Sequence, residues 1–75
     1  MNAMIHIRKT ILKVSQRELA AISGVTQTTV SRWEAGSLEP SREEMLKIRD
    51  EARKRRLRWN DRWFFETPAT EARAS

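Results

Sequence analysis

The chain is short of the residues that several classes of protein require: it has no cysteine, one histidine and no long apolar run. Without cysteine it can form neither a disulfide nor a thiolate metal site, and nothing favours secretion. The single His6 has no second histidine to share a metal ion, so we expect no metal and no cofactor. No stretch approaches the roughly 18 apolar residues of a membrane span, and Arg8 and Lys9 come too early for a signal peptide. We therefore expect a cytoplasmic protein.

Catalytic signatures are missing as well. The sequence holds no Gly-rich phosphate loop and no pairing of a nucleophile with a base. Its adjacent acid pairs, at residues 43–44 and 50–51, would point in different directions on a helix, because neighbouring helical residues do not face each other. Such carboxylates are typical of helix-dipole and solubility charges. We expect that the protein is not an enzyme.

What the chain has in excess is positive charge. Fifteen lysines and arginines against ten acids give a net charge of +5, which favours a polyanionic partner, chiefly nucleic acid. The 75 residues allow one domain at most, and a chain this short buries only about 60% of its unfolded surface. A monomer would be marginally stable, so a partner subunit would help it.

Helix signals divide most of the sequence into four segments. A first helix is expected over about residues 3–12, where apolar side chains recur at helical spacing: Met4, Ile7 and Ile11. The second begins at a capping box of Ser15 and Glu18 and ends at Gly24, which can adopt a positive φ. The third has Thr26 as its N-cap and Gly36 as its terminator.

The fourth helix follows a short loop in which Pro40 keeps the residue before it out of helical geometry. Ser41 and Glu44 form a second capping box at its start. Its inward stripe consists of Met45, Ile48 and Ala52. The sequence thus predicts an all-α fold, a compact bundle of four to five helices.

The third helix has an unusual exposed face. At about 100° per residue, Val30, Trp33 and Glu34 share one side. Thr28, Ser31 and Arg32 point the opposite way, and Gln27 projects from the tip. These amide, hydroxyl, methyl and guanidinium groups match base edges in the major groove of DNA, whereas a helix built only for solubility would carry glutamate and lysine. Small Ala20 at the helix crossing and Gly24 at the corner complete a helix-turn-helix geometry, with Val25 and Val30 in the seam.

The stretch from Ser15 to Ser41, "SQRELAAISGVTQTTVSRWEAGSLEPS", resembles the helix-turn-helix domain of the phage Cro and C1 repressors and their bacterial relatives. The resemblance covers residues from about 5 to 54. It depends on residues in family order and spacing: Gln16, Leu19, Ala20, Gly24, Val25, Val30, Trp33, Glu34, Gly36 and Pro40.

The resemblance implies a role for each matching position. Gln27, Thr28 and Arg32 would read bases, with help from Thr29 or Ser31. Ser15, Gln16 and Thr26 would bind phosphates, which helix N-termini favour. Glu34 would be structural and pair with Arg8 or Lys9, and Trp33 is expected in the core rather than stacked on a base.

Two departures from the family pattern stand out. The loop after Gly36, "SLE", lacks the usual basic residues, so Arg42 would supply a phosphate contact in their place. The connection between the first two helices is about one residue longer than usual, which leaves the choice between Arg8 and Lys9 open.

The basic run "RKRRLR" at residues 53–58 permits three interpretations. It is a solvated helix face, a phosphate or minor-groove contact made by Arg55 and Arg56, or a membrane-surface patch. A membrane patch would need the apolar face that the core also needs, which disfavours it.

After residue 58 the composition becomes aromatic, and Trp59, Trp63, Phe64 and Phe65 crowd into seven residues. Asn60 would cap a short fifth helix through about residue 66, although a hairpin turning at Asn60-Asp61 is the competing interpretation. We expect a helix-turn-helix DNA-binding domain at residues 1–58. Residues 59–75 would be a dimerisation segment with a frayed tail. The alternative is that these aromatic side chains fold back onto the first and fourth helices of their own subunit.

The resemblance implies binding to double-stranded DNA. A small chain bound to a promoter can exclude polymerase, so we expect a transcriptional repressor of the phage type or one that regulates its own operon. One reading helix spans few base pairs, and a homodimer with helices about 34 Å apart would read a palindrome. The competing hypothesis is an antitoxin whose aromatic C-terminal segment binds a toxin.

Overall fold

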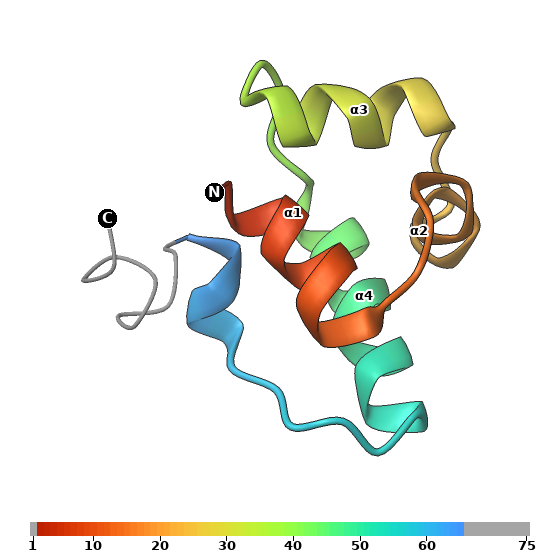
Figure 1. The fold of residues 1–75 in the computed structure, drawn as a ribbon, viewed down its shortest axis with the longest axis vertical. Coiled ribbons are helices and arrows are strands. Elements are labelled where there is room, and N and C mark those ends of the chain that lie inside the picture. The colour runs from red at the N-terminus through yellow and green to blue at the C-terminus, as the bar shows by residue number, and fades with distance from the viewer. Residues whose placement is uncertain (1, 66–75) are drawn as a thin grey trace.

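The computed structural model describes residues 2–65, and the only regular secondary structure in that part of the chain is helical (Figure 1). The predicted all-α fold is therefore confirmed, and the hairpin at residues 60–61 is wrong. None of the described helices is long and apolar enough to cross a membrane. The elements in chain order are α1 (Ala3–His6), the π-helix η1 (Ile7–Leu12), α2 (Gln16–Ser23), α3 (Gln27–Ala35), α4 (Arg42–Lys54) and the 3₁₀-helix η2 (Asp61–Phe64).

The predicted caps set most of the helix boundaries. Ser15 Oγ accepts from the backbone of Glu18 at 3.0 Å, and the Glu18 carboxylate accepts from the backbone of Ser15 at 3.0 Å. Ser41 and Glu44 repeat this reciprocal arrangement at the start of α4. Each such box satisfies two backbone groups that a helix end would otherwise leave unpaired. At their C-termini, α2 and α3 end at Gly24 and Gly36, with φ of 75° and 81°.

The first predicted helix is not a regular α-helix. After α1 the chain widens into η1, where the N–H groups of Lys13 and Val14 both reach back to the carbonyl of Arg8. A π-helical turn holds about one residue more than an α-turn, so η1 contains more residues per turn than an α-helix would. The widening also rotates the apolar pattern, because Leu12 is buried where Ile11 was expected and Ile11 is only half-buried.

The core lies where α1, η1, α2, α3 and α4 meet. Its largest fully buried side chain is Trp33, which is 1% exposed and confirms that this indole belongs to the core. Ala20 is buried at the α2–α3 crossing and Val25 packs beside it. The remaining core consists of Met4, Ile7, Leu12, Val14, Leu19, Val30, Ile48 and Ala52.

The basic run at residues 53–58 continues beyond the end of α4. α4 stops at Lys54, and Arg56 adopts a left-handed conformation with φ of 59°. The N–H of Leu57 then returns to the carbonyl of Ala52 at 2.9 Å, which closes the helix end. Only Arg53 and Lys54 of the run therefore lie on a helix face.

Beyond this turn the chain doubles back, and η2 lies beside α1 (Figure 1). Asn60 caps η2 as predicted, since its side-chain oxygen accepts from the backbone of Arg62 at 3.0 Å. Three of the four aromatic side chains, Trp59, Trp63 and Phe64, pack against the core of their own subunit. This is the fold-back alternative, and only Phe65, which is 77% exposed, stays in solvent. The expected continuation of η2 to residue 66 and the expected tail lie outside the described residues.

Three contacts hold η2 in place. The ring of Trp63 meets His6 of α1 edge-on, with centroids 5.5 Å apart. Asp61 accepts a hydrogen bond from the indole of Trp59 at 2.8 Å and lies 3.8 Å from Arg49 of α4. Aromatic pairs of this geometry stabilise beyond simple burial, so residues 59–64 form part of the folded unit.

Candidate nucleic-acid interface

α3 lies along one edge of the molecule, with α2 against its N-terminal end (Figure 1). One side of α3 is buried through Val30 and Trp33, at 0% and 1% exposure. The opposite side is open to solvent along its length. The side chains exposed there are Gln27, Thr28, Ser31 and Arg32.

Thr29 differs from the other residues predicted to read bases. It is half-buried, and its hydroxyl oxygen lies 3.0 Å from that of Thr26, the N-cap of α3. Thr26 also accepts from the backbone of Thr29 at 3.2 Å. The structure thus places Thr29 in the capping arrangement at the start of α3 rather than on the exposed row.

Glu34 pairs with Arg8 rather than with Lys9, the two partners that the sequence left open. The carboxylate accepts two hydrogen bonds from the guanidinium, at 2.5 Å from Nε and 3.1 Å from Nη2. This bidentate geometry is the strong form of a charge-assisted pair. Arg8 also donates to the carbonyl of Val14 at 3.2 Å, so one guanidinium ties α3 to the chain just before α2. Lys9 is exposed and adds only its charge.

The Glu34 carboxyl stays ionised despite its burial. Burial alone raises its pKa, but the hydrogen bonds from Arg8 and Gln16 outweigh that effect, and the pKa falls below its ordinary value of 4.5. The carboxylate is therefore a permanent acceptor at neutral pH. It faces the interior partners rather than the open row, where a negative charge would repel a polyanion.

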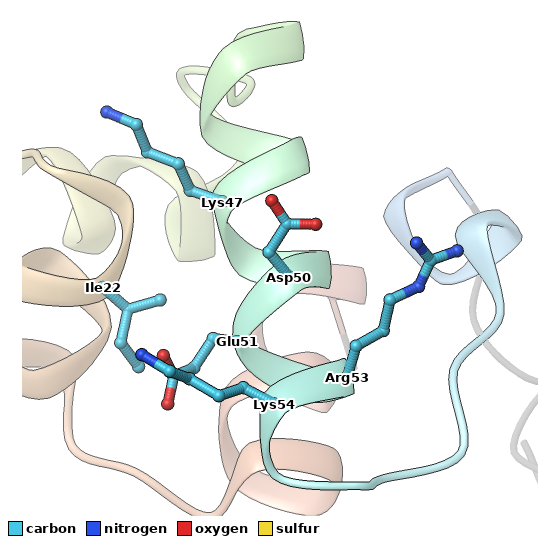
Figure 2. Close-up of a pocket in the computed structure, with 6 residues that line it drawn as sticks. All are labelled: Ile22, Lys47, Asp50, Glu51, Arg53 and Lys54. Carbon is cyan, nitrogen blue, oxygen red and sulfur yellow. The ribbon is translucent and has the colours of Figure 1, made fainter.

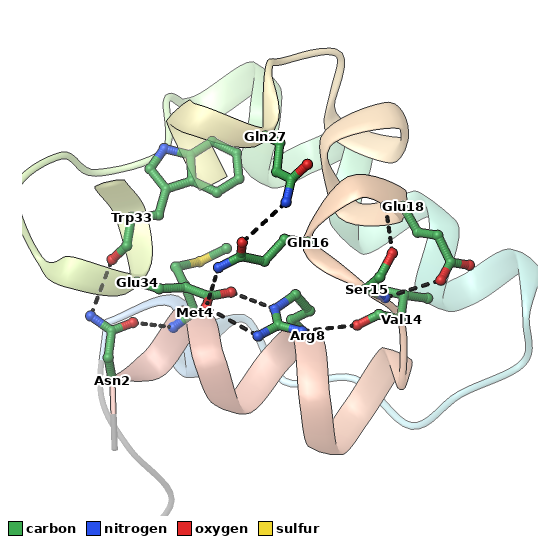
Figure 3. Close-up of polar contacts among 10 residues, drawn as sticks. All are labelled: Asn2, Met4, Arg8, Val14, Ser15, Gln16, Glu18, Gln27, Trp33 and Glu34. Atoms are coloured by element: carbon green, nitrogen blue, oxygen red, sulfur yellow. Dashed lines mark hydrogen bonds and ion pairs between the residues drawn. The ribbon is translucent and has the colours of Figure 1, made fainter. Parts of the chain in front are cut away.

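Gln16 extends this arrangement to the tip of the reading helix (Figure 3). Its side-chain amide donates to Glu34 at 3.0 Å, and its oxygen accepts from the amide of Gln27 at 3.5 Å. A chain of side-chain contacts thus runs from Arg8 through Glu34 and Gln16 to Gln27. It restrains the side chain of Gln27, which is otherwise exposed at the first residue of α3. The sequence suggested only that Gln16 binds phosphate. Its contacts with Glu34 and Gln27 were not predicted. The available signal was its place as the first residue of α2, next to the N-cap Ser15.

The other predicted phosphate contacts fall into two groups. Ser15 and Thr26 are exposed N-caps at the starts of α2 and α3, where helix amides favour anions. Arg42, by contrast, is exposed at the first residue of α4 and lines a hollow with Phe64 and Phe65. It lies with the C-terminal segment, not with the capping residues of α2 and α3.

The charge of Arg55 acts on the first turn of α2. Hydrogen bonds from Ser15 lower the pKa of Glu18, and the positive charge of Arg55 lowers it further. Arg55 is already paired, since its Nε donates to Glu51 at 2.7 Å. Arg56 is exposed next to it. Both arginines are therefore exposed just beyond the end of α4, and the charge of Arg55 acts on the first turn of α2.

A hollow of about 560 Å³ between α2 and α4 has a different character (Figure 2). Lys54 extends from α4 toward Ile22 of α2, Lys47 extends toward Gly24 at the end of α2, and Asp50 and Glu51 lie on the same helix. Its charges are of both signs and its only apolar wall is Ile22. Within residues 2–65, no three His, Asp or Glu side chains come together as metal ligands do.

A comparison with models of known families agrees with this geometry. The model described as helix-turn-helix matches residues 6–54, which spans α2, the turn at Gly24, α3 and α4. No curated protein and no solved structure matches the chain. Because the match covers well over half of the 75 residues, it shows the family directly. The chain belongs to the Cro/C1-type helix-turn-helix family of DNA-binding transcription regulators.

Proposed function

We propose that the protein is a transcriptional repressor, of the phage type or one that regulates its own operon, that acts in the cytoplasm and binds a palindromic operator as a homodimer. The observation that carries this proposal is the exposed row on α3, whose opposite side is buried in the core. An exposed row of uncharged hydrogen-bonding groups with one arginine adds little to stability, and such groups match base edges in a major groove.

Each side chain of the row has a fitting chemical partner. The Arg32 guanidinium can donate to both acceptors of a guanine, and the Gln27 amide can pair with adenine. The methyl of Thr28 can contact the methyl of thymine. The hydrogen bond that the Gln27 amide donates to Gln16 favours one orientation of the Gln27 side chain, so less rotamer freedom is lost when that side chain binds a base.

Ser15, Gln16 and Thr26 would fix the position of α3 through phosphate contacts, with Arg55 and Arg56 adding charge beside the first turn of α2. Repression needs no further domain, since a bound protein can exclude polymerase from a promoter. A homodimer fits because one α3 spans few base pairs, and two copies about 34 Å apart select a longer site.

Binding selection on randomised double-stranded DNA tests the proposal. The wild-type chain should enrich a palindrome, and Arg32→Ala should lose preference at one base pair in each half-site, with a cost of about 1–3 kcal/mol there. Arg53→Ala is the matched control, because Arg53 is equally exposed but lies on α4. No enrichment for the wild type, or an unchanged preference in Arg32→Ala, contradicts the proposal.

The second candidate is an antitoxin that masks a toxin with its C-terminal aromatic segment. The exposure of Phe65 at 77% is the observation in its favour, since a large exposed aromatic side chain suits a protein partner. The packing of Trp59, Trp63 and Phe64 on their own core leaves less of that segment for a toxin, so we prefer the repressor. Co-purification of a second small protein at a fixed stoichiometry would reverse this preference.

A further inference from the structure

The apolar surface of the described chain is concentrated on one side of the C-terminal half. Three large hydrophobic side chains within residues 2–65 are exposed: Leu38 at 43%, Leu46 at 36% and Phe65 at 77%. They come from the α3–α4 loop, from α4 and from the residue after η2. Although they are distant in sequence, the hollows of the surface show that they are neighbours.

Three shallow hollows, of about 230, 240 and 140 Å³, all have Phe64 and Phe65 in their walls. The first also contains Met45 and Leu46, the second Leu38 and Pro40, and the third Pro40 and Met45. Phe65 is therefore the centre of a continuous surface. We call it the Phe65 face, and it consists of Leu38, Pro40, Met45, Leu46 and Phe65.

The rim of the Phe65 face carries both signs of charge. Arg42 is exposed on one side of it, and Glu39 and Asp61 are exposed beside the same hollows. The Asp61 side chain is 64% exposed, so its pairing with Arg49 at 3.8 Å leaves it accessible. A two-fold interface requires one surface to be complementary to itself, with residue i against residue j and j against i. An apolar centre with both charges at its edge meets that requirement.

We propose that the Phe65 face binds a second copy of this chain, and that this contact joins the two halves of the dimer. The inference deepens the proposed function and rests on it for the palindromic arrangement. The face adjoins Gly36, the C-cap of α3, which also lines one of its hollows. Pairing near Gly36, at the C-terminal end of α3, leaves the N-terminal end at Gln27 free for DNA, because the length of the helix separates the two ends.

This assignment keeps Phe65 from the residues first expected to make the contact, and it removes Trp59, Trp63 and Phe64, which pack against the core of their own chain. Trp63 is half-buried and its ring contacts both His6 and Trp59, with centroids 5.5 and 5.4 Å apart. Those contacts are made within one subunit. Trp63 therefore stabilises residues 59–65, the C-terminal arm, which presents Phe65. Because Phe65 is the only exposed aromatic side chain of the face, we expect the free dimer to be weak and DNA with two half-sites to strengthen it.

The test is the oligomeric state by sedimentation equilibrium, without DNA, at up to about 1 mM chain, which populates even interfaces with a Kd of about 100 µM. The wild type should shift from 8.8 kDa toward twice that mass. Phe65→Asp places two like charges at the centre of the contact and should weaken dimerisation at least about tenfold. Thr10→Asp, on the exposed side of η1, is the matched control and should dimerise like the wild type.

Trp63→Ala separates the two roles of the aromatic segment. It should lower the melting temperature but still dimerise at temperatures where it is folded. A wild type that stays at 8.8 kDa overturns the proposal and leaves the Phe65 face to a different protein. A dimer unaffected by Phe65→Asp also overturns it.

Loss of the dimer contact can be distinguished from loss of DNA binding. Phe65→Asp should bind an isolated half-site as tightly as the wild type does and lose only the gain from the second half-site. A dimer that enriches no DNA sequence would refute the repressor and leave the Phe65 face in place.

Discussion

The Glu34 carboxylate accepts hydrogen bonds from both Arg8 and Gln16, and Glu34→Ala tests how these bonds hold the reading helix. The substitution removes the acceptor for two bonds from Arg8 and one from Gln16. It leaves the guanidinium with the carbonyl of Val14 as its remaining partner. Gln16 would also lose the bond that orients it toward Gln27.

The size of the effect follows from the burial of the pair. The side chains of Arg8 and Glu34 are 11% and 9% exposed. Exposed ion pairs contribute about 0–1 kcal/mol, whereas removal of one partner from a fully buried pair costs about 3–5 kcal/mol. This pair lies close to the buried limit but at the edge of the core. We therefore expect Glu34→Ala to lower the free energy of unfolding by about 2–4 kcal/mol.

Urea denaturation followed by far-UV circular dichroism at pH 7 measures this change. Glu43→Ala removes an exposed carboxylate from the first turn of α4 and is the matched control, with an expected cost within about 0.5–1 kcal/mol. The double variant Arg8→Met, Glu34→Leu should lose less free energy of unfolding than the single variants Arg8→Met and Glu34→Leu lose together, by about 1–3 kcal/mol. Equal effects of Glu34→Ala and Glu43→Ala would refute the reasoning.

The pH dependence gives an independent check. The pKa of Glu34 is lower in the folded chain than its ordinary 4.5, so the unfolded state takes up a proton first as the pH falls. The stability from this carboxylate is therefore fully present above about pH 4.5 and lost as the pH falls through the lower, folded value. Glu34→Gln should abolish that part of the acid dependence, and an unchanged acid profile would speak against it.

Three further predictions concern separate parts of the molecule. Gly24→Ala should lower the free energy of unfolding by about 1 kcal/mol because φ is 75° there, and Lys47→Ala should not restore it, since the new Cβ meets only the flexible Lys47 Nζ at 3.1 Å. In filter-binding titrations against salt, the double variant Arg55→Gln, Arg56→Gln should reduce the slope of log K by about 0.9 per lost phosphate contact, without changing the preferred sequence. In thermal denaturation, Trp63→Ala should cost about 1–3 kcal/mol, less than a fully buried tryptophan, because the ring is half-buried against His6.

The helix boundaries could be predicted because their causes are local. Ser15, Thr26 and Ser41 cap the residues just after them, and Gly24 and Gly36 end helices through their own φ angles. These effects act over three or four residues, so the sequence alone contains them. The burial of Val30 and Trp33 followed from helical periodicity in the same way.

The features that escaped prediction depend on contacts between distant segments. The π-helical turn of η1 depends on how the chain joins α1 to α2 while both helices pack on the core, and no local pattern in residues 7–12 predicted it. Arg8 and Lys9 are chemically alike in the sequence, and only the rotation of the helix selects Arg8 for Glu34. The path of the aromatic segment depends on His6 and Arg49, which are ten or more residues away from it in sequence.

The base-reading residues themselves stay predictions. The structure places Gln27, Thr28, Ser31 and Arg32 on one open face, as periodicity required, and it withdraws Thr29 into the capping arrangement. Which base each side chain contacts depends on how α3 is oriented in a groove, and phosphate contacts set that orientation.

The three tryptophans lie in three different surroundings, which gives the protein its own optical reporters. Trp33 is 1% exposed, and its indole nitrogen has no acceptor among residues 2–65. Trp59 donates to a carboxylate at 2.8 Å, while Trp63 contacts a neighbouring histidine ring. A dry indole emits at shorter wavelength than one beside a charge or water. The blue part of the fluorescence spectrum therefore reports the core behind the reading helix, and the red part reports the C-terminal arm. Loosening of that arm can thus be distinguished from unfolding of the whole domain in a single sample.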